Sequence, residues 1–104
     1  MKFEMITPGQ LDDYVGNPEA LIIDLRESEE FVQRHIRGAV NIPYERFQKK
    51  VMFPMDMELI LYCGRGSVSI SAARSLSERG YRVKTVVGGI HAYRGPNAVS
   101  DFGV

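Results

Sequence analysis

The chain has 104 residues, 44% of them hydrophobic and 25% charged, and its 13 basic and 13 acidic side chains cancel. We expect residues 1–104 to form one domain around a modest core. The absence of a basic excess argues against nucleic acid or an anionic membrane as the main partner, and no apolar run approaches the length of a membrane span. The single cysteine and an N-terminus without a signal peptide's apolar stretch predict a cytoplasmic protein.

The first half of the chain predicts, in order, a helix, a strand, a second helix, a short strand and a short helix. A helix begins at Thr7, because TPGQ supplies a threonine cap, proline at the first helical position and glutamine three residues after the cap. It ends at residues 17–18, and the apolar run at 20–24 is typical of a strand buried on both faces. Serine and two glutamates at 28–30 favour a second helix start. The elements expected next are a strand at 38–43 and a helix at 44–50.

The second half of the chain continues the alternation of apolar strands and helices. A buried strand at 58–63 is followed by a helix at 67–79, and Gly80 supplies the left-handed residue that ends helices. The elements expected after it are a strand at 83–87, a glycine turn at 88–89 and a short helical piece at 90–93. Apolar strands alternating with helices predict an α/β fold with a parallel sheet covered by helices on both faces.

The only cysteine, Cys63, stands where a ligand binds in such a fold, beyond the carboxyl end of a strand and before a helix. The unpaired N–H groups and the dipole of that helix favour a thiolate. Gly64 and Gly66 allow the loop N–H groups to turn inward as an anion-binding nest, and Arg65 adds a positive charge. The competing interpretation is a small buried residue that only fills space.

Three stretches resemble the signatures of the rhodanese (sulfurtransferase) domain family. The segments IDLRESEEF at 23–31 and HIRGAVNIP at 35–43 are similar to its first signature, and YCGRGSVS at 62–69 to its active-site segment. GGIHAY at 88–93 looks like its closing motif, which usually has tryptophan where Tyr93 stands. The resemblance extends from about residue 5 to residue 95 and keeps the order and spacing of the motifs.

The resemblance implies a central parallel sheet of about five strands and a sulfur-carrying cysteine. In the family's chemistry the thiolate, here Cys63, takes sulfane sulfur from a small donor such as thiosulfate and becomes a persulfide. An acceptor, cyanide or a thiol, then removes that sulfur, so the transfer has two steps. No dissociable cofactor is implied. The residues implied to bind the substrate and the persulfide are Gly64, Arg65, Gly66, Ser67, Val68 and Ser69.

The loop after Cys63 differs from the commonest pattern of the family and leaves alternatives open. Many active members have arginine five residues after the cysteine, where this chain has Val68. A protein persulfide, which needs less anion recognition than thiosulfate, is therefore another possible donor. A cysteine-based phosphatase or arsenate reductase needs an arginine at the position of Ser69, and Arg74 lies too far along the helix. A non-catalytic module for interaction or sulfur carriage is the third interpretation.

Other polar residues have weaker claims to function. In a family of this kind Asp24 and Arg26 look structural and brace the loop from the neighbouring strand end. His35 precedes a turn and is expected to be a hydrogen-bonded scaffold residue rather than a base for Cys63. His91 is expected at the surface near the loop. The chain has no close spacing of metal ligands, and the lysines at 49–50 are interpreted as a solvated helix end.

Overall fold

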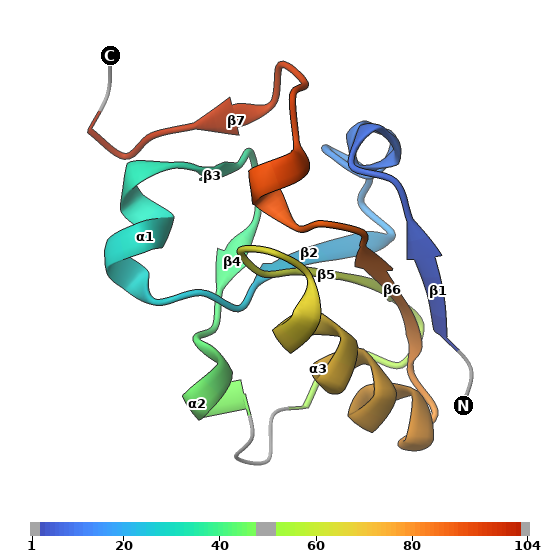
Figure 1. The fold of residues 1–104 in the computed structure, drawn as a ribbon. Coiled ribbons are helices and arrows are strands. Elements are labelled where there is room, and N and C mark those ends of the chain that lie inside the picture. Colours follow the sequence, from blue (N-terminus) through green and yellow to red (C-terminus); the bar gives the residue numbers. More distant parts are fainter. Residues whose placement is uncertain (1–2, 48–51, 103–104) are drawn as a thin grey trace.

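A computed structural model of the chain describes residues 3–47 and 52–102. Its centre is a five-stranded sheet in the order β1-β6-β5-β2-β4, and all neighbouring strands are parallel (Figure 1). The strands are β1 (Phe3–Ile6), β2 (Ala20–Asp24), β4 (Val40–Asn41), β5 (Glu58–Tyr62) and β6 (Arg82–Val86). The predicted α/β class and the sheet of about five strands are confirmed.

The sheet is buried on both faces because successive side chains of a strand point to opposite sides. In β5, Leu59 and Leu61 join the apolar cluster under one face, whereas Ile60 and Tyr62 join the cluster under the other. The first face is covered by the α-helices α2 (Tyr44–Phe47) and α3 (Ser67–Glu78), and the second by the 3-10 helices η1 (Gly9–Asp13) and η2 (Ile90–Ala92). Continuous apolar strands are the sequence pattern that this double burial requires.

Two elements lie beyond the main sheet. Helix α1 (Ser28–Gln33) follows β2 on the side of β4 (Figure 1), and a small antiparallel pair joins β3 (His35–Ile36) to β7 (Ala98–Val99). The pair contacts the core through Ile36, whose N–H donates to the hydroxyl of Tyr62. None of the helices within 3–47 and 52–102 is long and apolar enough to cross a membrane.

Several element predictions need correction. The first helix is a 3-10 helix that ends at Asp13, although Thr7 and Gln10 do exchange the two hydrogen bonds of a capping box. Helix α1 has Glu27 at its N-cap position and no side-chain capping bond, so Ser28 is not its cap. The strand expected at 38–43 is only the two-residue β4, because a turn with positive φ at Gly38 precedes it.

The remaining boundaries agree closely with the sequence. The predicted strands at 20–24, 58–63 and 83–87 match β2, β5 and β6 to within a residue at each end, and α3 ends one residue early. Gly80 follows α3 with a φ of +94° as expected. The helix expected at 44–50 is α2, and its residues 48–50, with the lysines at 49–50, lie outside the described residues.

Candidate active site

Cys63 follows the last residue of β5 and lies at the bottom of an open pocket of about 370 Å³. Its side chain is buried, with 4% of the residue exposed. The sulfur accepts hydrogen bonds from the backbone N–H groups of Gly66, at 3.1 Å, and of Ser69, at 3.4 Å. Both donors belong to the start of α3, where N–H groups have no partner within the helix. Two loop N–H groups thus point inward at the sulfur, in the way an anion-binding nest requires.

The loop that holds these donors is tied to the neighbouring strand β6. The hydroxyl of Thr85 donates to Ser69 Oγ at 2.6 Å, and Ser69 Oγ donates to the carbonyl of Gly66 at 3.2 Å. Ser69 and Thr85 are both fully buried. Gly66, the N-cap residue of α3, has a φ of +104°, which other residues adopt only with strain. These buried side-chain hydrogen bonds therefore hold the loop in place without competition from water.

The glycine turn before η2 clamps the other side of the loop. The N–H groups of Ile90 and His91 donate to the carbonyls of Cys63, at 3.0 Å, and Gly64, at 3.1 Å. Gly89 has a φ of +64°, and a Cβ atom there would lie 2.4 Å from both of those carbonyl oxygens. Only glycine fits, so the sequence GGI is explained by the close approach of the turn to the cysteine loop.

The pocket has two walls, and the sequence predicted one of them. From the cysteine loop, the pocket is lined by Gly64, Arg65, Ser67 and Val68. Gly66 and Ser69, which were also predicted to bind the substrate, do not line it, and instead donate their N–H groups to the Cys63 sulfur. The remaining lining residues are Leu25, Arg26, Glu27, Glu30 and Tyr44, which come from the segments after β2 and form the other wall, and His91, which lies beside the cysteine loop. The strand order could have indicated most of this wall. Because β2 and β5 are parallel neighbours, the residues that follow the two strands meet at the same end of the sheet.

Asp24 and Arg26 form an ion pair at the end of β2. Asp24 is fully buried, and its Oδ2 lies 2.9 Å from Arg26 Nη2, while its Oδ1 accepts the Arg26 backbone N–H. The same guanidinium donates to the carbonyl of Arg34. Burial, the largest single influence, lowers the pKa of Arg26, but the hydrogen bond to Asp24 and the negative charge of Asp24, with smaller charge effects nearby, together outweigh burial and raise it. Because Asp24 neutralises Arg26, the pair fixes the pocket wall and adds little net charge to the pocket.

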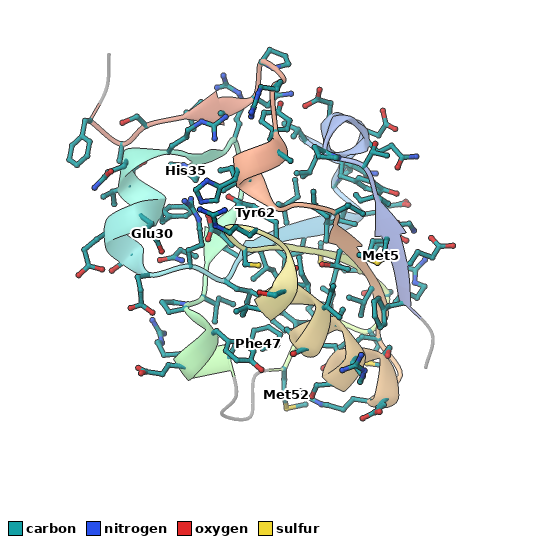
Figure 2. All side chains as sticks on the ribbon, in the orientation of Figure 1. Met5, Glu30, His35, Phe47, Met52 and Tyr62 are labelled. Carbon is teal, nitrogen blue, oxygen red and sulfur yellow. The ribbon has the colours of Figure 1, made fainter. Side chains whose placement is uncertain are left out.

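The two other predicted polar residues lie in different surroundings. His35 (Figure 2) stacks on Phe31 with ring centroids 3.9 Å apart, and its Nδ1 bonds the Phe31 carbonyl at 2.8 Å. It does not line the pocket, which favours the scaffold interpretation over a base for Cys63. Arg65 is exposed at the pocket and makes no hydrogen bond or ion pair within the described residues, so its charge is available to a ligand.

Known proteins resemble the chain along most of its length. Residues 7–95 match the family model described as Rhodanese-like domain. The thiosulfate sulfurtransferase GlpE of Actinobacillus succinogenes is 34% identical over 98 residues, which cover 90% of this chain and 86% of that protein. The tRNA sulfurtransferase of Desulfurococcus amylolyticus is 30% identical over 92 residues, or 88% of this chain, but the match spans only 18% of that longer protein.

Solved structures agree with the fold. A rhodanese-related protein of Thermoplasma volcanium superposes with a TM-score of 0.84 at 25% identity, covering 93% of this chain and 98% of the other. Reduced CoADR-RHD of Bacillus anthracis gives a TM-score of 0.80 at 34% identity, covering 88% of this chain and 16% of that one. The chain belongs to the Rhodanese-like domain family.

Proposed function

We propose that the chain is a sulfurtransferase that carries sulfane sulfur on Cys63 as a persulfide. The observation that supports this most is that the Cys63 sulfur, in the pocket, accepts hydrogen bonds from the backbone N–H groups of Gly66 and Ser69. Donors aimed at a sulfur stabilise a thiolate, which is the nucleophilic form of cysteine. The sulfurtransferase names of relatives at about one-third identity support the same assignment.

The proposed transfer has two balanced steps. The Cys63 thiolate attacks the outer sulfur of thiosulfate, the bond between the two thiosulfate sulfurs breaks, and sulfite leaves with the electron pair. The persulfide then carries the negative charge on its terminal sulfur, within reach of the same loop. A thiophilic acceptor attacks that terminal sulfur, the bond to Cys63 breaks, and the thiolate is restored. With cyanide the product is thiocyanate, and with a thiol it is a new persulfide.

The chemistry of the pocket bears on the choice of donor. Val68 lines it and packs against the apolar cluster, so it offers no hydrogen bond to a sulfonate. Arg65 has no hydrogen-bond or ion-pair partner among the described residues, and Arg26 is neutralised by Asp24. We infer that thiosulfate binds weakly and that a persulfide, of a small thiol or of a protein, is the better donor. The single cysteine supports work in a reducing, cytoplasmic compartment.

The test is the intact mass of the protein before and after incubation with thiosulfate or a small-molecule persulfide. Because Cys63 is the only cysteine, a gain of one sulfur atom locates the persulfide without digestion. The gain should disappear on adding cyanide or a thiol and should be absent in Cys63→Ser, which keeps a small polar side chain. No gain with any donor would contradict the enzyme assignment and favour an interaction module. Cys63-dependent cleavage of an aryl phosphate would instead favour a phosphatase.

A further inference from the structure

His91 places an imidazole at the pocket, beside the loop that carries Cys63. Its backbone N–H is held by the Gly64 carbonyl at 3.1 Å, which fixes where the side chain starts. A methyl group on Gly64 would lie 3.3 Å from both Cδ2 and Nε2 of the ring, so that edge of the imidazole faces the loop. The residue is exposed and lines the pocket, and its ring makes no hydrogen bond with the described residues. The imidazole is therefore available to a ligand.

The other charged groups that line the pocket are unsuited to taking a proton from a thiol. Arg26 and Arg65 are permanent cations. Glu27 and Glu30 are exposed carboxylates, and a carboxylate is a far weaker base than an imidazole. In the transfer to an acceptor, Cys63 already holds the sulfur. Imidazole is the side-chain base suited to proton transfer near neutral pH, and His91 carries the one imidazole among the described residues that line the pocket.

We propose that His91 is the general base for the second half-reaction, in which an acceptor removes the sulfur from Cys63. Because a base is useful only where the acceptor must lose a proton, the acceptor is a thiol rather than an acceptor that needs no deprotonation. This rests on the proposed sulfurtransferase function. As the acceptor sulfur attacks the terminal sulfur of the Cys63 persulfide, its S–H proton passes to Nε2 of His91. The bond between the two persulfide sulfurs breaks, and Cys63 leaves as a thiolate. The acceptor departs as a persulfide anion, and the imidazolium then gives its proton to water, so charge and atoms balance.

The size of the effect is limited by the chemistry of thiols. A thiol with an ordinary pKa of about 8.5 is about 3% ionised at pH 7. Generating the remaining thiolate at the site can accelerate transfer by at most about 30-fold. A thiol that is fully ionised at the assay pH has no proton to remove and gains nothing. The dependence on acceptor ionisation therefore separates a base from a residue that merely shapes the pocket.

The experiment loads the full chain with a small-molecule persulfide, or with thiosulfate in a parallel run, removes the donor, and follows loss of the persulfide by intact mass at pH 7. The acceptors are an alkyl thiol of ordinary pKa and an aryl thiol that is already ionised. His91→Gln keeps a polar group near Nε2 but cannot accept a proton, and His91→Asn repeats the test with a shorter side chain. The matched control is His35→Gln, which changes the chain's other histidine, outside the pocket.

We expect both His91 variants to load normally and to slow discharge by the alkyl thiol between about threefold and 30-fold, with discharge by the ionised thiol changed less than twofold. His35→Gln should leave the ratio of the two rates at its wild-type value. Equal slowing with both acceptors, or none with either, would overturn the assignment of His91 while leaving the Cys63 persulfide intact. Absence of loading in the wild-type chain would overturn the proposed function and this inference with it.

Discussion

Replacing Gly89 by alanine tests how the cysteine loop is positioned. Gly89 combines a φ of +64° with a ψ of −162°, a region open essentially to glycine alone, where another residue costs up to about 3 kcal/mol. The new Cβ would also lie 2.4 Å from the carbonyl oxygens of Cys63 and Gly64. Relieving such an overlap costs about 1 to 3 kcal/mol more. We expect Gly89→Ala to lower the free energy of unfolding by about 4 kcal/mol, a large part of the ~5–15 kcal/mol of a domain of this size.

The assay is urea unfolding at neutral pH, with Gly16→Ala as the matched control. Gly16 also has a positive φ, +79°, but a Cβ there meets nothing within 4 Å. It should therefore cost only the backbone strain, about 1 to 2 kcal/mol. Gly89→Ala should in addition slow persulfide loading, because the turn can no longer hold the Cys63 and Gly64 carbonyls. Equal losses of stability in the two variants would refute the clamp that we assign to this turn.

Three further predictions concern the pocket and the buried ion pair. Val68→Arg should lower the KM for thiosulfate about tenfold, because a guanidinium at the pocket can bond the sulfonate; an unchanged KM in steady-state assays would contradict the account of donor choice. Asp24→Asn should cost about 3 kcal/mol in urea unfolding, because Arg26 keeps its charge beside a neutral amide, and Asp24→Asn with Arg26→Met should recover part of that loss. Burial and the charge of Asp24 raise the pKa of Tyr62 above its ordinary 10.0, so the unfolded chain loses this proton first and stability falls above pH 10. Tyr62→Phe should reduce that fall by about 1 kcal/mol between pH 10 and pH 11, measured by urea unfolding at the two pH values; an unchanged fall would show that Tyr62 ionises alike in both states.

The sequence was most informative where burial leaves few choices. The run ALIID becomes β2 without a change of boundary because the strand is covered on both faces, so every position before Asp24 is apolar. The cysteine loop was equally predictable, since a strand end followed by glycines and a helix start fixes where the N–H groups point. The hydrogen bonds from Gly66 and Ser69 to the sulfur realise that expectation.

What the sequence left undetermined depends on contacts between distant segments. Strand β1 lacks an unbroken buried run because it is an edge strand, and its Glu4 and Met5 are exposed. The pairing of β3 with β7 joins residues 35–36 to residues 98–99, which no local pattern indicates. The other wall of the pocket likewise requires the strand order, which brings Glu30 and Tyr44 to the same pocket as the cysteine loop. His91 was predicted at the surface near the loop and lies there, exposed and lining the pocket. The hydrogen bond that holds it to Gly64 is the part that only the structure shows.

The central claim is that the N–H groups of Gly66 and Ser69 stabilise the sulfur charge of Cys63 and of its persulfide. The most direct measurement is the amide resonances of the ¹⁵N-labelled chain before loading, after loading with a sulfane donor, and after discharge by a thiol. We predict that the Gly66 and Ser69 amides shift most on loading, return on discharge, and do not respond to the donor in Cys63→Ser. A chain that gains sulfur by mass while these two amides stay in place would contradict the account.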